Sequence, residues 1–461
     1  MSTFNEVNEK MTKYRWVICS LLFFATTINY MDRNVISFLK EFFCSPIADG
    51  GFGWSNSDFS YVTACFTAAY AGITVFSGII IDKIGSKLGL ALSLIIWSFS
   101  GIGNAFVGKT VTFHIIIRSL FGLGEAGNFP ASIKTVTEWF PKRERALATG
   151  IFNSGSNIGA MISALFVPWC LIHFGGPLGW KMAFIITGAV GFLWLFFWYV
   201  LYESPSKMRE KGKVNKAEYT LIHSDDAELT PEQVENEKNG VKEKVSWAKL
   251  LRYPQTWSFF FGKFMTDGIW WFLLFWLPDY LKKQFSMTTQ EVMWPTFIVF
   301  GIAIFGSVFG GSIPMFFMNK GWNAYKSRMT AMLLIAVCPV LLLLTQYFGN
   351  KEIFGSYAMY LATGVICIAG AAHQAWSANI FTTVSDMFPK KAVASVTGIG
   401  GLAGGIGGVL VQLLAGFITD LYVKTPEVAY GIMFGVCAFA YLIAWGIMKT
   451  LVPQYKIITD L

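Results

Sequence analysis

The sequence has few charged residues and few histidines for its length. Only 14% of its 461 residues are Asp, Glu, Lys or Arg, and only four are His. Soluble domains usually carry about 25% charged residues, whereas here 54% of the residues are hydrophobic and 17% are aromatic. This balance excludes a chain of soluble domains and indicates a membrane protein.

Several motifs of energy-coupled and catalytic proteins are missing as well. The absence of a Walker A motif argues against an ATP-driven pump. The sequence also contains no set of residues typical of a catalytic site, which argues against an enzyme. The seven cysteines lack C-x-x-C spacing and mostly lie in apolar runs, so we expect no metal site and no disulfide framework. The net charge of +8 comes mostly from basic residues in the loops between apolar runs, so the sequence does not indicate a nucleic-acid-binding surface.

Two glycine-rich stretches invite a cofactor interpretation that their context does not support. Residues 122–127, GLGEAG, formally match the dinucleotide fingerprint, but that motif requires a preceding strand and a βαβ unit. The match lies within a long apolar run that we expect to be helical. For residues 398–408, GIGGLAGGIGG, we predict a surface for close helix packing.

Long apolar runs are what the sequence does have. Spans of about 20 apolar residues cross a membrane as helices, and roughly twelve such runs are found, which predicts an all-α polytopic membrane protein. The predicted spans are 15–39, 57–81, 88–108, 111–137, 145–172, 179–202, 255–280, 291–318, 327–347, 355–384, 392–421 and 429–451.

The loops between these spans differ in their content of Lys and Arg. The first apolar run is too long for a signal peptide and lacks a small-residue cleavage site, so we predict a retained first helix. Loops after even-numbered spans are basic, for example DKIGSK, PKRER and ESPSKMREKGK, whereas the opposite loops are poor in basic residues. The positive-inside rule therefore predicts that both termini are cytoplasmic.

The sequence predicts two related halves joined by one polar segment. Residues 203–253 are the only extended polar stretch, which predicts a first six-helix bundle over 1–202, a cytoplasmic linker, and a second bundle over 254–461. EWFPKRERALATG at 138–150 and DMFPKKAVASVTG at 386–398 match at a constant offset of 248 residues. Duplicated six-helix halves that rock about a midplane site are typical of secondary transporters.

Ionisable residues inside the spans are the strongest functional candidates, because a charge at the bilayer centre costs about 2.5–3.5 kcal/mol even on insertion scales. Fixed bridges between helices are the structural alternative, and Lys263 with Asp267 has the i,i+4 spacing for one. In the functional interpretation the carboxylates carry a proton and the arginines hold an anion. The 248-residue offset also places His373 opposite Glu125, and a hydrogen-bonded packing group is the alternative for this lone histidine. The full set is Asp32, Arg33, Arg118, Glu125, Lys263, Asp267 and His373.

Polar and aromatic residues within the spans predict a cavity for a sugar-like ligand. One helix carries three tryptophans, Trp270, Trp271 and Trp276, and we expect one of them to stack on a ligand. Aromatic residues near helix ends also anchor at the interface, which is the alternative. The polar candidates are Tyr30, Tyr70, Asn153, Ser156, Asn157, Gln374, Trp376 and Asn379.

Several motifs resemble those of a known family. GIIIDKIGSK at 78–87 is similar to the loop 2–3 motif of the major facilitator superfamily, with Gly78, Asp82, Gly85 and Lys87 in the expected places. Its counterpart at 310–328 keeps glycine and basic residues but has no Asp at the matching position. INYMDR, the segment that begins at RSLFGLGEAGNFP, and FMTDGIWWFLLFWLPDYL resemble the anion:cation symporters, most closely bacterial hexuronate transporters.

The resemblance implies proton-coupled import of a sugar acid, with galacturonate or glucuronate as the expected substrate. It implies that Asp32 and Glu125 are protonation sites, and that a substrate carboxylate competes with Asp32 for Arg33. Because consecutive helical residues point about 100° apart, partners on other helices are the alternative for Asp32 and Arg33. It also implies gating roles for Asp82 and Lys87. The expected substrate-binding residues are Tyr30, Arg33, Tyr70, Arg118, Ser156, Asn157, Lys263, Trp271, His373, Gln374, Trp376 and Asn379.

We expect no cofactor other than the proton, no metal, and a monomer in the inner membrane of a bacterium. Another organic anion, such as an aldonate, aldarate or aromatic acid, is the alternative substrate. A membrane-embedded sensor or enzyme would require an appended soluble domain or a catalytic constellation, and the sequence has neither. A passive channel or uniporter would show uptake that is insensitive to pH and to uncouplers.

Overall fold

The computed structural model describes residues 11–224, 246–454 and 458. Within these residues the secondary structure is helical and contains no strand. The first bundle consists of α1 (Tyr14–Cys44), α2 (Asn56–Ile84), α3 (Ser86–Gly103), α4 (Val111–Glu125), α5 (Asn128–Trp139), α6 (Lys142–Phe174) and α7 (Gly176–Leu201).

The second bundle follows a few short helices. The segments between the bundles are α8 (Pro205–Glu210), α9 (Lys216–Ile222) and α11 (Trp247–Leu250). The second bundle consists of α12 (Pro254–Phe285), α13 (Met293–Asn319), α14 (Ala324–Val337), η3 (Cys338–Leu344), α15 (Thr345–Phe348), α16 (Lys351–Phe354), η4 (Gly355–Tyr357), α17 (Ala358–Met387), α18 (Lys390–Leu421) and α19 (Pro426–Leu451).

Each predicted span falls on a helix or on a helix with one interruption. Among the described residues, nine helical segments are long and apolar enough to cross a membrane. The other three predicted spans fall on α1, on α4 with α5, and on α12, which carry most of the charged residues expected inside the membrane. The chain is therefore an all-α protein that crosses the membrane several times.

Two predicted spans are interrupted well inside their bounds. The span 111–137 breaks between α4 and α5 at Ala126 and Gly127. The span 327–347 changes from α14 to the 3₁₀ helix η3 at Cys338, directly before Pro339. Proline lacks the amide hydrogen that an α-helix interior requires, so it is tolerated at the start of a new helical segment.

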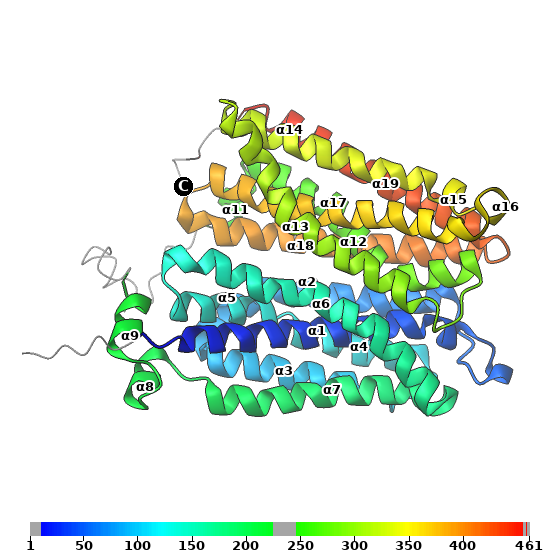
Figure 1. Ribbon diagram of the computed structural model, residues 1–461, viewed down its shortest axis with the longest axis horizontal. Coiled ribbons are helices and arrows are strands. Elements are labelled where there is room, and N and C mark those ends of the chain that lie inside the picture. Colours follow the sequence, from blue (N-terminus) through cyan, green and yellow to red (C-terminus); the bar gives the residue numbers. More distant parts are fainter. Residues whose placement is uncertain (1–10, 225–245, 455–457, 459–461) are drawn as a thin grey trace, which may run out of the picture.

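The two bundles lie side by side along their length, with α1–α7 in the lower half of Figure 1 and α12–α19 in the upper half. Three helix pairs join them: α2 packs on α18, α6 on α13, and α1 on α12. The beginning of α1 and the end of α19 lie at the same end of the molecule (Figure 1). We call this the terminal end and the opposite one the distal end.

The glycines of α18 permit this close packing, as predicted for residues 398–408. A Cβ added to Gly405 would lie 2.1 Å from the Cβ of Ala71 on α2, and one added to Gly407 would lie 2.0 Å from the carbonyl oxygen of Phe264 on α12. Real Cβ atoms do not approach so closely, so α18 fits between α2 and α12 only with glycine there. The prediction of a packing surface is confirmed.

The contact between α2 and α18 is tight at the distal end and ends near the middle. A Cβ on Gly416 would lie 2.2 Å from the Ser60 hydroxyl oxygen, close to the distal end of both helices. Toward the terminal end, an added Cβ on Gly78 or Gly401 would have no heavy atom within 4 Å. The bundles are therefore joined at the distal end and are less closely packed toward the terminal end along this seam.

Candidate functional site

The centre of the candidate site is a buried ion pair between α1 and α4. The Nε of Arg33 donates a hydrogen bond to Oε2 of Glu125 at 2.9 Å, and their side chains are only 3% and 0% exposed. Removing one member of such a pair leaves an uncompensated buried charge, which costs about 3–5 kcal/mol. The two charges are therefore strongly coupled.

Aromatic rings surround the Arg33 guanidinium. Its Cζ lies 4.4 Å from the ring centroid of Tyr30, 4.8 Å from that of Tyr70 and 5.1 Å from that of Trp271, with Phe66 at 5.6 Å. Such distances allow cation–π attraction. Trp271 belongs to the second bundle and the other rings to the first, so this aromatic cage lies where the two bundles meet. Of the three tryptophans considered, Trp271 is the one against Arg33.

Arg118 is a second buried cation beside this pair. Its Nη2 donates to the main-chain carbonyl oxygen of Arg33 at 3.1 Å, and its Cζ lies 4.7 Å from the Phe121 ring centroid. Its Nε and Nη1 and the Oε1 of Glu125 have no hydrogen-bond partner among the described residues. Unsatisfied buried polar groups cost about 1–3 kcal/mol each, and functional sites are where proteins tolerate them.

Asp32 does not pair with its neighbour Arg33, so the predicted Asp32–Arg33 pair is wrong. Its carboxylate lies beside the Thr187 hydroxyl on α7 and the Trp97 indole on α3. Neither of its oxygens forms a hydrogen bond of normal geometry with the described residues. Consecutive helical residues point about 100° apart. The Asp32 side chain therefore points into the first bundle, while the Arg33 side chain points toward the seam between the two bundles.

The second bundle contains its own charged pair and a stacked histidine. Lys263 Nζ lies 2.7 Å from Oδ2 of Asp267, which confirms the predicted i,i+4 contact. Nδ1 of His373 lies 2.7 Å from the Tyr441 hydroxyl, and the His373 ring stacks on Trp270 with the centroids 5.0 Å apart. In this conformation His373 is held by packing and by Tyr441 within the second bundle.

The remaining polar candidates divide between the seam and the interior of the second bundle. Gln374 on α17 donates to Oδ1 of Asn157 on α6 at 3.4 Å, which links the bundles. The neighbouring Ser156 hydroxyl donates to the carbonyl of Asn153 in its own helix. Asn379 donates to the carbonyls of Gly310 and Ala375, both at 2.8 Å, and Trp376 is buried against Tyr441, so both pack within the second bundle.

The predicted gating residues form separate contacts at the terminal end. Asp82 forms an ion pair with Lys134 on α5 at 3.4 Å. Lys87 donates to Glu203 at 2.7 Å, and this hydrogen bond lowers the pKa of the Glu203 carboxyl from its ordinary value. Each residue thus holds helix ends of the first bundle together, and their gating role stays a prediction.

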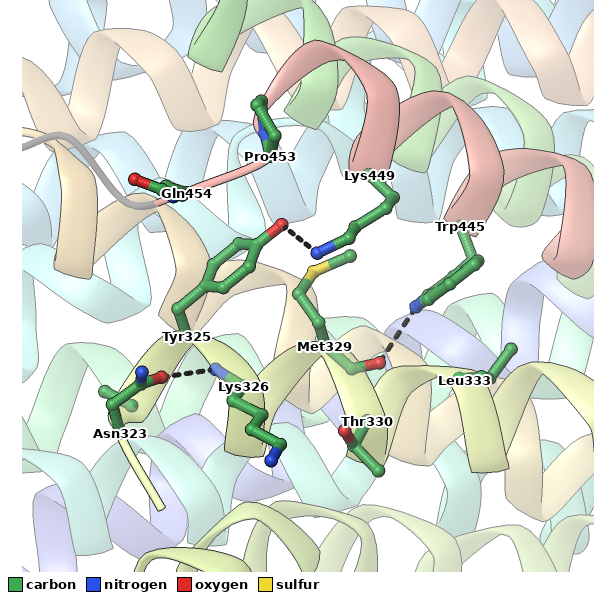
Figure 2. A pocket seen from close by; sticks show the side chains of 11 residues that line it. Asn323, Tyr325, Lys326, Met329, Thr330, Leu333, Trp445, Lys449, Pro453 and Gln454 are labelled. Atoms are coloured by element: carbon green, nitrogen blue, oxygen red, sulfur yellow. Dashed lines mark hydrogen bonds between the residues drawn. The ribbon is translucent and has the colours of Figure 1, made fainter.

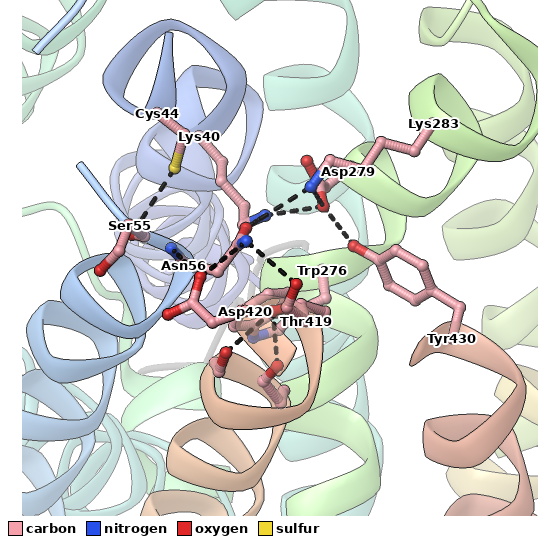
Figure 3. A network of polar contacts seen from close by, with 12 residues as sticks. Lys40, Cys44, Ser55, Asn56, Trp276, Asp279, Lys283, Thr419, Asp420 and Tyr430 are labelled. Carbon is pink, nitrogen blue, oxygen red and sulfur yellow. Dashed lines mark hydrogen bonds and ion pairs between the residues drawn. The ribbon is translucent and has the colours of Figure 1, made fainter. Parts of the chain in front are cut away.

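A buried polar network at the distal end was not predicted from the sequence. Lys40 on α1 donates to Oδ2 of Asp279 on α12 and to Oδ1 of Asn56 on α2, both at 2.7 Å (Figure 3). Asp279 also pairs with Lys283 at 3.1 Å and accepts a hydrogen bond from the Tyr430 hydroxyl. Lys40 is 1% exposed and Asp279 3%, so their attraction acts with little screening by water.

The same network continues from α2 to α18. The main-chain amides of Asn56 and Ser57 each donate to a carboxylate oxygen of Asp420 at 2.8 Å. The side chain of Gln412 accepts from Thr63 and from Trp276. We call Lys40, Asn56, Asp279, Lys283, Asp420 and Tyr430 the distal latch, because they join α1 and α2 to α12, α18 and α19.

Two residues of the distal latch lie at the boundaries of predicted spans. Asp279 lies just inside the predicted span 255–280, and Lys40 directly follows the span 15–39. Charged residues at such boundaries usually lie in the headgroup region, so their position alone did not mark them as buried.

We predict that Asp279→Asn weakens the distal latch and opens the distal end. The substitution leaves Lys40 and Lys283 close together without their shared carboxylate, which destabilises the state in which the bundles touch there. The readout is maleimide labelling of Ser60→Cys, a position buried against Gly416, after replacement of the seven native cysteines. We expect labelling at least about tenfold faster, equivalent to about 1.4 kcal/mol.

Glu41→Gln is the matched control for this experiment. Glu41 pairs with the buried Lys282 near the latch, but the Glu41 carboxylate itself is 56% exposed, so water screens this pair more than it screens Lys40–Asp279. We expect its labelling rate to stay close to that of the parent protein. Equal rates for Asp279→Asn and the parent would show that the latch does not hold the bundles together.

The fold and the site together define a class of protein: a polytopic membrane protein with two helical bundles and buried opposite charges where they meet. The model of the Major Facilitator Superfamily matches residues 22–411. The chain belongs to this superfamily. It is a membrane transporter and not an enzyme.

Transporters with named substrates align with two thirds or more of this chain. The hexuronate transporter of Escherichia coli K12 is 28% identical over 441 residues, which cover 95% of each chain. The galacturonate transporter of Dickeya chrysanthemi is 28% identical over 67% of this chain and 84% of its own. The D-galactonate transporter of Escherichia coli O6:H1 is 26% identical over 95% of this chain and 97% of its own.

Solved structures share the fold. A bacterial homologue of the human lysosomal transporter Spinster, in an inward-facing conformation, has a TM-score of 0.69 at 17% identity, covering 96% of this chain and 97% of its own. The inward-open xylose transporter XylE from E. coli has a TM-score of 0.67 at 15% identity, covering 96% of this chain and 100% of its own.

Proposed function

We propose that the chain is a proton-coupled symporter that imports a sugar acid, most specifically a hexuronate such as galacturonate or glucuronate. The single observation that carries this proposal is the buried Arg33–Glu125 pair within an aromatic cage contributed by both bundles. The proposal places the protein in the inner membrane of a bacterium, as a monomer with both termini in the cytoplasm.

An anionic substrate fits the cations of the site. The guanidinium of arginine binds a carboxylate through two parallel hydrogen bonds. In the proposed cycle, a substrate carboxylate replaces Glu125 at Arg33, and the released Glu125 takes up a proton. Arg118, with two unsatisfied nitrogens nearby, attracts the same negative charge. Asp32 lies next to these groups and is proposed as a second protonation site.

A sugar ring fits the aromatic and amide side chains around Arg33. Tyr30, Tyr70 and Trp271 present ring faces and edges against which the apolar face of a pyranose can pack. Asn157 and Gln374 supply donors and acceptors at the seam, which suits several hydroxyl groups. The named substrates of the relatives, hexuronate, galacturonate and galactonate, support a sugar acid.

Alternating access requires that the seam open at each end in turn. In the structure the distal latch joins the bundles, whereas α2 and α18 are less closely packed toward the terminal end. With cytoplasmic termini, this conformation is the one that releases substrate into the cell. Breaking the latch and closing the opposite end would complete the cycle.

Competition for uptake tests the proposed substrate. Labelled galacturonate uptake into proteoliposomes is measured with unlabelled glucuronate, galactonate, gluconate or glucose as competitor. We expect the hexuronates to compete at least tenfold better than the open-chain aldonates, or about 1.4 kcal/mol, because a flexible chain loses more conformational entropy on binding. Glucose, which has no carboxylate, should not compete.

Two outcomes would change the assignment. Equal competition by galactonate or gluconate would favour the alternative of an aldonate or another organic anion. Uptake unaffected by an imposed pH gradient and by an uncoupler would indicate a passive uniporter instead of a proton symporter.

A further inference from the structure

A cavity lies between α14 and α19 at the terminal end, away from the aromatic cage. It has a volume of about 730 Å³, and Figure 2 shows the side chains that line it. Tyr325, Met329 and Leu333 line it from α14, Trp445 and Lys449 from α19, and Pro453 from the residues after α19. The transport cluster described above uses none of these residues.

Lys449 places a positive charge in this cavity. Its Nζ donates to the Tyr325 hydroxyl at 2.9 Å and lies 4.5 Å from the Tyr325 ring centroid. The Tyr325 hydroxyl in turn donates to the carbonyl oxygen of Val452 at 2.7 Å. In the described parts of the chain no carboxylate forms an ion pair with Lys449. The ammonium is thus positioned by an aromatic ring, and no acidic side chain of residues 11–224 or 246–454 neutralises its charge.

The composition of the cavity matches the interfacial layer of a membrane. The Trp445 indole nitrogen donates to the Met329 carbonyl at 2.8 Å, and Trp and Tyr favour the headgroup level of a bilayer. Lys326 supplies a second, exposed cation on α14. Farther along α14, the following η3 and α19, exposed apolar side chains continue toward the middle of the membrane, namely Leu334, Leu341, Phe439 and Ile443.

We infer that this cavity binds the headgroup of an anionic phospholipid, with the phosphate at Lys449 and the acyl chains along α14 and α19. Basic pockets between transmembrane helices are sites for anionic lipid headgroups. A free phosphate would be attracted by the same charge, but it would make no use of Met329, Leu333 or the apolar strip. The inference rests on the membrane fold and not on the proposed transport cycle.

Native mass spectrometry of the full chain tests the inference. Purified protein is titrated with dioleoylphosphatidylglycerol or with dioleoylphosphatidylcholine, which have the same acyl chains and differ in net charge. We expect the first lipid to bind more tightly, and Lys449→Gln to weaken its binding about fivefold, the contribution of one Lys near an anionic membrane surface. Lys449→Arg should retain most of the binding because it keeps the charge.

Lys424→Gln is the matched control. Lys424 is exposed and lies just before the start of α19, at the opposite end of this helix from Lys449. It should leave phosphatidylglycerol binding unchanged, and thermal unfolding should show that all variants are folded. Inorganic phosphate at millimolar concentration should not displace the lipid. Equal binding of both lipids, equal losses in Lys449→Gln and Lys424→Gln, or displacement by phosphate alone would each overturn the inference.

Discussion

Glu125→Gln should abolish uphill uptake driven by a pH gradient while it preserves substrate exchange across the membrane. Glutamine resembles the protonated acid in shape but cannot release a proton, so coupling is lost while the ligand contacts remain. It also removes the carboxylate that competes with substrate for Arg33. We therefore expect at least about a hundredfold loss of uphill accumulation, corresponding to about 2.7 kcal/mol of lost coupling, with counterflow within a few-fold of the parent protein.

The assay compares two transport modes in the same proteoliposomes. Uphill uptake is measured with an inward pH gradient, and counterflow is measured with substrate on both sides and no gradient. Glu352→Gln is the control, because Glu352 is exposed on α16 at the distal end. Equal loss of both modes in Glu125→Gln would favour a structural role for the Arg33–Glu125 pair and would contradict its role in coupling.

Arg33→Ala should reduce substrate affinity by about a hundredfold, or about 2.7 kcal/mol, and Arg33→Lys by less. Alanine removes both the cation and the hydrogen-bonding fork, whereas lysine keeps a charge without the paired geometry. Isothermal titration calorimetry with galacturonate measures the difference. Unchanged affinity in Arg33→Ala would rule out a direct contact between Arg33 and the substrate carboxylate.

A double variant separates loss of binding from loss of structure. Arg33→Ala leaves Glu125 as a buried charge without its partner, which by itself destabilises the fold. Arg33→Ala combined with Glu125→Gln removes both charges, so its thermal unfolding temperature should recover toward that of the parent. Its affinity should stay low. Recovery of affinity along with stability would show that Arg33→Ala acts only through the fold.

The environment of Asp32 shows why neighbours in sequence are poor guides to ion pairs. Asp32 and Arg33 are adjacent, yet Arg33 pairs with Glu125, 92 residues later in the chain. The direction of a helical side chain is set by the rotation between residues, and this rotation separates Asp32 from Arg33. The same rule correctly predicted the contact of Lys263 with Asp267, because four residues return to the same side of a helix.

The sequence by itself determined the features that depend on local chemistry. Apolar runs of membrane length determined the helices, the repeated Phe-Pro-Lys segment predicted two related halves, and the rarity of charge singled out Arg33, Arg118 and Glu125. The glycines at 398–408 indicated close packing without naming the partner helices. Each of these properties follows from hydrophobicity, residue size or spacing along a single segment, and so needs no knowledge of the fold.

Only the tertiary structure decided which distant groups meet. The rings around Arg33 come from three helices, and Lys40 and Asp279 of the distal latch are 239 residues apart. Contacts of this kind depend on the rotation and depth of each helix in its bundle. These are set by packing against several neighbours at once, as at Gly405 and Gly407. No single segment contains that information, because the rotation and depth of a helix are defined only relative to the helices around it.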